Sequence, residues 1–261
     1  MFFTSLDGVR ELSHKRIEAP DGSVYVNHIH PHCEMLFFVE GEADYNIDGQ
    51  ILRPRPGDIL CIPAATYHYL MPKAAIPYEN YVIGVEPERL PEEQYRLLFS
   101  APYLMRMRDD EVVRRRFADL DAYRRQYSDA DFARCAEAAM TELFTYLYYR
   151  KREHGRTDED AALTYPERIV RYIADHLREP MDAERISRHF LLSPSYVQNL
   201  FSSHMHIGLR TYILQKKIFS AHGDLLRGDR PKDVCERYAF GDYSSFYRLY
   251  KKTFGHSPKG T

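Results

Sequence analysis

Residues 241 to 258 read GDYSSFYRLYKKTFGHSP, and this stretch decides how the second half of the 261-residue chain folds. Asp242 is a residue type that caps helices, and Phe246 and Tyr250 recur at four-residue spacing on one face. Gly255 is a helix stop signal. The stretch therefore predicts a helix from Asp242 to Phe254 with one apolar and one polar face.

The same pattern of a short helix, a tight turn and a second helix occurs earlier in the chain. Asp182 can cap a short helix that ends near residue 189, and Ser193, followed by proline, can start the next helix. A long helix at about 209–226 separates this pair from the second pair, whose first helix ends near Tyr238. The second half is therefore expected to be all-helical, with two helix-turn-helix units.

A helix-turn-helix places its second helix in the major groove of DNA, so the outer face of that helix should carry hydrogen-bonding side chains. Both candidate helices do. Glutamine and asparagine can pair with adenine, arginine with guanine, and lysine with phosphates. The expected DNA-binding residues are Ser195, Gln198, Asn199, Ser202, Tyr243, Ser244, Ser245, Arg248, Lys251 and Lys252.

The stretch 241–258 resembles the signature of the AraC family of transcription regulators, and the resemblance extends over about residues 165–259. It implies double-stranded operator DNA as a partner and base contacts from both second helices. The family pattern has glycine where this chain has Leu191, Ala239 and His206, and arginine where it has Lys217. If the two helix-turn-helix turns at Leu191 and Ala239 need a positive φ, each side chain there costs on the order of 1 kcal/mol.

The first half has short β-like segments separated by turn signals. Examples are residues 24–26, 35–39, 43–47, 59–62 and 81–85, with the turns Asp48-Gly49 and Arg55-Pro56-Gly57-Asp58 between them. Strands of this length and spacing predict an antiparallel barrel or jelly roll. Together the two halves predict an α+β chain with two domains.

Four polar residues in this half have the spacing of the two cupin motifs. His28, His30 and Glu34, followed by Gly41, resemble the first motif, and His68 resembles the last ligand of the second. Because residues two apart on a strand share a face, His28, His30 and Glu34 are expected to point into a barrel that could hold an effector, with His68 as the fourth group.

Three imidazoles and one carboxylate suit a divalent transition metal such as zinc, nickel, iron or manganese. The alternative is that these side chains, His28, His30, Glu34 and His68, bind a sugar or another small effector directly, without a metal. The residues alone leave both possibilities open.

Between the halves, helical periodicity begins near Pro91, and the apolar stripe of Met140, Leu143, Phe144 and Leu147 can pack on its own barrel or on a second chain. Packing between two chains is slightly favoured, which makes a homodimer the expected assembly. We expect an effector-binding domain at 1–90, a helical connector at 91–155 and a DNA-binding domain at 162–261, the last beginning with a capping box at Thr164 and Glu167.

Charge is divided between the halves. From Asp160 onward there are 16 Lys and Arg against 11 Asp and Glu, whereas the first 159 residues hold 20 against 27. A basic C-terminal domain suits a phosphate backbone. No apolar run approaches the roughly 18 residues that a membrane span needs, and the N-terminus lacks a secretory pattern, so we expect a cytoplasmic protein.

These patterns favour a ligand-responsive, sequence-specific transcription regulator, and the family resemblance implies genes of carbohydrate or other small-metabolite use. RNA polymerase is a further expected partner if the protein activates transcription. The alternative is a metal-dependent cupin enzyme, an oxygenase or isomerase, fused to a DNA-binding module. No obvious general base stands beside the four polar residues, which favours the regulator.

Overall fold

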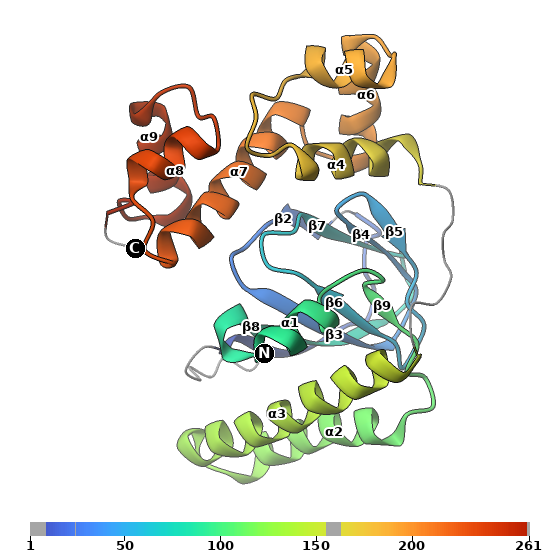
Figure 1. The fold of residues 1–261 in the computed structure, drawn as a ribbon. Coiled ribbons are helices and arrows are strands. Elements are labelled where there is room, and N and C mark those ends of the chain that lie inside the picture. The colour runs from blue at the N-terminus through green and yellow to red at the C-terminus, as the bar shows by residue number, and fades with distance from the viewer. Residues whose placement is uncertain (1–8, 24, 155–162, 260–261) are drawn as a thin grey trace.

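The computed structural model describes residues 9–23, 25–154 and 163–259. It consists of a β-barrel, two long helices beneath the barrel, a short helix beside it and a helical domain above it (Figure 1). The α+β organisation expected from the sequence is confirmed.

The barrel is made of two antiparallel sheets. The five-stranded sheet has the order β1-β8-β3-β6-β9, and the four-stranded sheet has the order β2-β7-β4-β5. The strands are β1 (Val9–Ile17), β2 (Tyr25–His28), β3 (Cys33–Glu40), β4 (Ala43–Ile47), β5 (Gln50–Leu52), β6 (Ile59–Ile62), β7 (His68–Pro72), β8 (Tyr78–Val85) and β9 (Leu104–Met105).

Strand β3 shows how the sequence alternation builds the barrel. Leu36 and Phe38 point between the two sheets into one apolar core, whereas Met35 and Phe37 join the core beneath the five-stranded sheet. Side chains of a strand alternate between its faces, so Glu34 shares the inward face with Leu36. The alternation therefore aims this carboxylate at the barrel interior.

Three α-helices follow the main strands: α1 (Glu92–Leu98), α2 (Glu111–Gln126) and α3 (Asp129–His154), after a single turn of 3₁₀ helix at Pro87–Arg89. Helices α2 and α3 lie beneath the five-stranded sheet (Figure 1), where the rings of Phe37 and Phe117 stack at 4.5 Å. Leu143 and Leu147 are fully buried in the same core. The stripe on α3 thus packs on its own barrel, and the slight preference for packing between two chains was wrong for this face. Amphipathic spacing shows that one face of a helix is buried, but it does not show whether the same chain or a second chain covers that face.

The C-terminal domain contains α4 (Tyr165–Asp175), α5 (Ala183–Phe190), α6 (Pro194–Met205), α7 (Leu209–Leu226), α8 (Pro231–Arg237) and α9 (Tyr243–Phe254). The expected caps are present. Asp182 and Asp242 each accept a backbone N–H three residues on at 2.8 Å, and Ser193 does so at 3.2 Å. The Glu167 carboxylate accepts the Thr164 N–H at 2.6 Å. Both helix-turn-helix units therefore begin and end near the positions that the sequence predicts.

The three positions where glycine was expected have left-handed backbone. Leu191 has φ 56°, His206 φ 52° and Ala239 φ 51°. A side chain with a Cβ is disfavoured in this region. The turns thus keep the geometry that suits glycine and carry side chains there.

Candidate functional site

The four polar residues His28, His30, Glu34 and His68 come together at one end of the barrel, where their ligand atoms all lie within 4.8 Å of one another. The expectation that His28, His30 and Glu34 share one strand was wrong. His28 ends β2 in one sheet, Glu34 lies in β3 of the other, and His30 lies in the turn between them. His28 is also the register partner of His68 in β7. The cluster is therefore assembled across both sheets.

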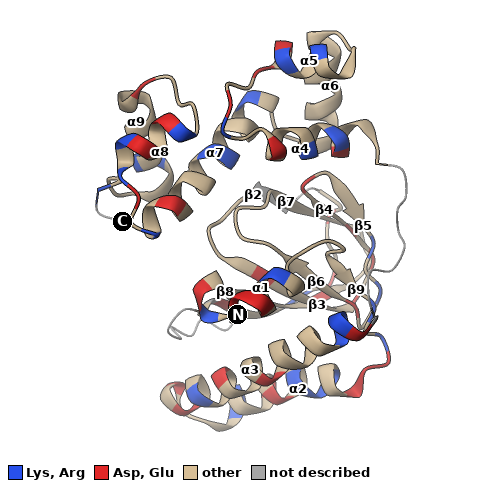
Figure 2. Ribbon diagram, viewed as in Figure 1, with Lys and Arg blue, Asp and Glu red and all other residues tan. Residues whose placement is uncertain are grey.

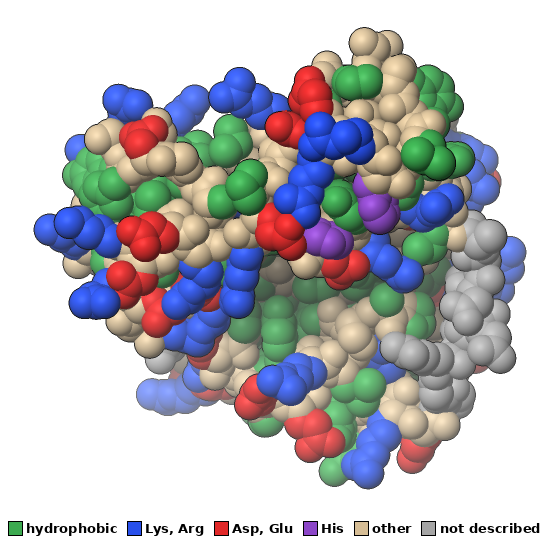
Figure 3. All heavy atoms as spheres, turned by 45° about the horizontal axis from the view of Figure 1, so that its top comes forward, with side chains coloured by type: hydrophobic (Ala, Val, Ile, Leu, Met, Phe, Trp, Pro, Cys, Tyr) green, Lys and Arg blue, Asp and Glu red, His purple; other side chains and the backbone are tan. Residues whose placement is uncertain are grey.

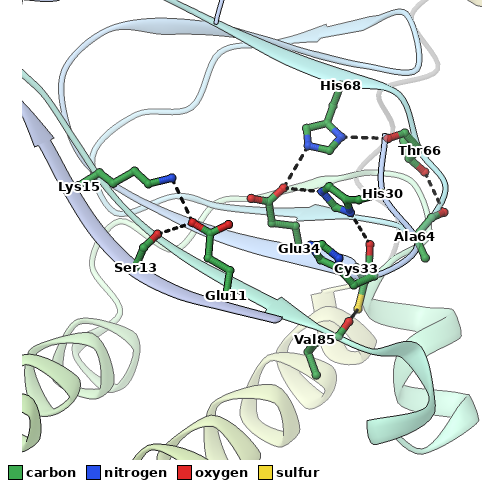
Figure 4. Close-up of polar contacts among 11 residues, drawn as sticks. Glu11, Ser13, Lys15, His30, Cys33, Glu34, Ala64, Thr66, His68 and Val85 are labelled. Atoms are coloured by element: carbon green, nitrogen blue, oxygen red, sulfur yellow. Dashed lines mark hydrogen bonds and ion pairs between the residues drawn. The ribbon is translucent and has the colours of Figure 1, made fainter. Parts of the chain in front are cut away.

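The Glu34 carboxylate contacts both His30 and His68, as Figure 4 shows. Its Oε2 lies 3.0 Å from His68 Nε2 and 3.3 Å from His30 Nε2. Burial alone raises the pKa of the Glu34 carboxyl, but the hydrogen bonds from His30 and His68 outweigh it and hold that pKa well below its usual value. Glu34 is therefore an ionised, buried carboxylate.

Both imidazoles have an oxygen acceptor at each nitrogen. His68 Nδ1 lies 2.9 Å from the Thr66 carbonyl oxygen, and His30 Nδ1 lies 2.8 Å from that of His32, while both Nε2 atoms face Glu34. A neutral imidazole has only one N–H to donate. The arrangement therefore suits a cation shared by the two Nε2 atoms and the carboxylate, with each Nδ1–H donated to its carbonyl oxygen.

The donor set fits a divalent transition metal. Histidines that bind metals commonly donate their other ring N–H to a carbonyl oxygen, as the Nδ1 contacts of His30 and His68 allow. Ligand atoms about 2.1 Å from zinc lie roughly 3.4 Å apart in a tetrahedron, so small side-chain shifts would suffice. His28 is exposed and His30 is half-buried, which leaves the cluster accessible from outside.

The barrel interior beyond Glu34 is filled. Phe38, Ile47, Leu60 and Ile62 are at most 1% exposed and pack between the sheets. Two cavities of about 530 and 700 Å³ lie elsewhere, around Arg106–Asp110 and beside β4 respectively, and neither is lined by the cluster. The space between the sheets beyond Glu34 is thus a packed core, and the polar cluster lies at its edge.

The expected DNA-reading side chains lie on the outer faces of α6 and α9. Val197 and Phe201 on α6, and Phe246 and Tyr250 on α9, are fully buried. The remaining faces carry the predicted set: Ser195, Gln198, Asn199, Ser244, Ser245, Arg248, Lys251 and Lys252 are exposed, and Ser202 and Tyr243 are half-buried. Ser202 Oγ donates to the Gln198 carbonyl at 2.8 Å, so its hydroxyl is already engaged within α6.

Basic side chains occur on the helices of the C-terminal domain, with acidic ones among them (Figure 2). In the space-filling view they are spread over the exposed face of that domain (Figure 3). This distribution suits a surface that meets phosphates. No helix among the described residues is long and apolar enough to cross a membrane.

The sequence did not reveal the contact between the two domains. Asp48 in the β4–β5 turn forms an ion pair with Lys216 of α7, with 2.8 Å between Oδ2 and Nζ. The Asp48-Gly49 dipeptide was recognised only as a turn signal, and nothing in its spacing indicates a partner 168 residues away. Such a contact depends on how the domains meet, which local patterns do not encode.

Both halves of the chain match known protein families. The family described as "AraC-like ligand binding domain" matches residues 12–165, and a "Helix-turn-helix domain" family matches residues 186–261. The uncharacterized HTH-type transcriptional regulator YdiP of Escherichia coli is 21% identical over 89% of this chain and 79% of its own length. The arabinose operon regulatory protein of Salmonella typhimurium is 26% identical over 84% of this chain and 79% of its own length.

Among solved structures, ToxT from Vibrio cholerae aligns over 96% of this chain and 95% of its own with a TM-score of 0.39 and 12% identity. The ligand-binding family match spans more than half of the chain and contains the polar cluster, and the helix-turn-helix match contains α6 and α9. The protein is therefore a regulator rather than a cupin enzyme, and the chain belongs to the AraC family of ligand-binding, DNA-binding transcription regulators.

Proposed function

We propose that this regulator senses a small effector at the cluster of His28, His30, Glu34 and His68, and that a divalent transition metal occupies this cluster. Zinc, nickel, iron or manganese suits the donor set. When bound, the metal supplies a Lewis acid that can hold a hydroxy or keto acid effector, or it is itself the signal. Glu34 and His68 contribute the buried ligands, and His28 and His30 form the accessible side.

The observation that supports a metal is that the imidazoles of His30 and His68 each have an oxygen acceptor next to both ring nitrogens. His68 is 4% exposed, so two adjacent imidazolium rings at this place carry a desolvation cost. A divalent cation provides the same positive charge and leaves each Nδ1–H to its carbonyl oxygen. The cluster is therefore better suited to a cation than to protons.

Elemental analysis of the purified, untagged chain tests the metal directly. About one metal ion per chain in the wild type, lost in His30→Ala/His68→Ala, supports the proposal. Glu79→Gln is a matched control, because Glu79 also pairs with a histidine, His14, at 2.7 Å but lies outside the cluster. No metal after loading with each of the four ions would overturn it.

A sugar or other organic effector held without metal is the second candidate. The similarity to two arabinose operon regulatory proteins, 26% and 25% identical over 84% of this chain, favours it. A chain that stays metal-free after loading but is stabilised thermally by a sugar would support this candidate. That stabilisation should be lost in His30→Ala/His68→Ala.

We further propose that α6 and α9 read two successive major grooves on one face of an operator. Their exposed polar faces and the rigid α7 between them support this arrangement. Selection of bound duplexes from a random pool tests it. Recovery of two short motifs about one helical turn apart is expected, whereas a pool that stays random would contradict it.

A homodimer is the proposed assembly, and RNA polymerase is the proposed partner at promoters that the protein activates. The stripe on α3 is buried against its own barrel, so a second chain must use another surface. Sedimentation of the full chain distinguishes a monomer from a dimer, and a monomer at micromolar concentration would contradict the assembly. Transcription from a promoter that carries the selected duplex, with purified RNA polymerase, tests activation.

A further inference from the structure

We propose that the outer face of the four-stranded sheet is a docking surface for the first helix-turn-helix unit and the adjoining helix α7, and that strand β7 couples this docking to events at the polar cluster. The inference deepens the proposed function and rests on it, because it assigns the regulation of the same site. It is carried by contacts between the two domains and by the alternation of side chains along β7.

The polar part of the docking contact is centred on Asp48. Its Oδ2 lies 2.8 Å from Lys216 Nζ, and its Oδ1 accepts the Tyr212 hydroxyl at 2.9 Å. The side chains of Asp48 and Lys216 are 15% and 12% exposed. Because water is largely excluded, this pair is screened less than an ion pair on the open surface.

Lys216 also donates to the carbonyl oxygen of Ala65, at 2.8 Å. Asp48 in turn accepts the backbone N–H of Tyr67 at 3.1 Å. One carboxylate and one ammonium therefore connect α7 to the segment 65–67, which leads directly into β7.

A second contact lies at the end of α6. The Tyr69 hydroxyl donates to the His204 carbonyl oxygen at 2.7 Å, and His204 Nε2 lies 2.7 Å from the Gly49 carbonyl oxygen. Tyr67 and Tyr69 are at most 2% exposed and share one apolar core with Phe201 of α6. The core of the first helix-turn-helix unit is thus completed by the barrel.

Strand β7 contacts the polar cluster with one face and the C-terminal domain with the other. His68 points inward to Glu34, whereas Tyr67 and Tyr69 on either side point outward to the C-terminal domain. His30 is tied to the same segment, because its carbonyl oxygen accepts the Ala65 N–H at 2.9 Å. A metal ion held by both His68 Nε2 and Glu34 would replace the direct contact between them, and the shift of His68 would be transmitted to its neighbours Tyr67 and Tyr69.

Docking leaves the reading face of α6 open. Gln198 and Asn199 remain exposed while His204 and Tyr212 contact the barrel. The docking contact therefore fixes the position of the first helix-turn-helix unit relative to α9. This position matters because α6 and α9 must contact DNA together. Linkage requires that docking and site occupation influence each other equally.

Hydrogen–deuterium exchange of the full chain tests the docking contact. Lys216→Met should raise exchange at least threefold in peptides covering residues 65–71, and Tyr69→Phe should raise it in peptides covering 204–212. Lys232→Met is the matched control, because Lys232 is an exposed lysine on α8. Wild-type exchange in both docking variants would overturn the docking surface.

The coupling is tested from the other side of β7. Glu34→Gln or His28→Ala should change exchange of residues 209–217 at least threefold, although neither side chain touches α7 in the contacts described above. Unchanged exchange of α2 and α3 in these variants shows that the barrel remains folded. If both variants leave residues 209–217 at the wild-type rate, the coupling is wrong.

Co²⁺ alone serves as the probe for occupation. Binding, followed by its visible absorption, should change exchange of residues 209–217 in the wild type but not in His30→Ala/His68→Ala. A wild type that does not bind Co²⁺ counts against the metal in the proposed function, while the variants still decide the coupling. Binding without any change at residues 209–217 overturns the coupling and leaves the metal site intact.

Discussion

His68 and Glu34 join the two sheets of the barrel through a contact of 3.0 Å between Nε2 and Oε2. The two residues lie in β7 and β3, and only the folded barrel brings them together. Because each of them also faces the other histidines, a cation bound here would link four separate chain positions. The thermal stability of the barrel should therefore depend on the metal.

Removal of the metal is predicted to lower the thermal midpoint. A ligand at 100 times its dissociation constant stabilises by about 2.7 kcal/mol, which corresponds to about 5 to 10 °C for a chain of this size. Dipicolinate should produce this decrease in the metal-loaded wild type, followed by circular dichroism. His30→Ala/His68→Ala should melt at the same temperature with and without the chelator, and an equal decrease in both proteins would contradict the prediction.

Leu191→Gly and Ala239→Gly are predicted to stabilise the chain by about 0.5 to 1 kcal/mol each, since both residues have positive φ. Leu191 is 91% exposed, so little buried surface is lost. Urea denaturation measures the change. Leu226→Gly is the control: Leu226 is also an exposed leucine but lies in α7, where glycine should destabilise by up to about 1 kcal/mol. Destabilisation by both turn variants would show that φ is not the determining factor.

Lys151→Met is predicted to destabilise the chain by about 1 to 3 kcal/mol, because it leaves buried carbonyl oxygens without a donor. The Lys151 ammonium donates to the carbonyl oxygens of Leu98, Ser100 and Pro102 at 2.7 to 3.0 Å, and burial lowers its pKa. Lys73→Met removes only an exposed ion pair with Glu42 and should cost at most about 1 kcal/mol. An equal loss of unfolding free energy in Lys151→Met and Lys73→Met, measured by urea denaturation, would contradict the assigned role of Lys151.

Arg248→Ala is predicted to weaken binding to the selected duplex by about 1 to 3 kcal/mol and to relax its specificity. Arg248 is exposed on α9, and its guanidinium lies 3.2 Å from Ser245 Oγ. Lys252→Ala should instead weaken selected and random duplexes alike and reduce the salt slope by about one. Fluorescence anisotropy at several salt concentrations separates the two, and unchanged discrimination in Arg248→Ala would contradict base reading.

The helical domain was largely predictable because its signals are local. Asp182, Ser193 and Asp242 each cap a helix within three residues, so the sequence alone locates α5, α6 and α9. Among the strands, β2, β3, β4, β6 and β8 overlap predicted segments, whereas β1, β5, β7 and β9 were not predicted. Charged residues such as Arg10, Glu11 and Lys15 interrupt β1 and hide its alternation.

The polar cluster was predictable in its members but not in its construction. Motif spacing identified His28, His30, Glu34 and His68, yet the turn at His30 and the pairing of His28 with His68 depend on how two sheets meet. The contact between Asp48 and Lys216 was not predictable at all, because no local pattern links residues so far apart. The sequence therefore predicts many of the elements, but it does not predict how those elements pack against one another.

The most direct test of the account is the affinity of the full chain for its selected duplex, with and without the metal that elemental analysis identifies. The account predicts that the metal, alone or with its effector acid, changes Kd at least about fivefold in the wild type. The same titration should leave Kd unchanged in His30→Ala/His68→Ala. Equal Kd values with and without the metal, in a wild type that binds it, would contradict the claim that the cluster controls DNA binding.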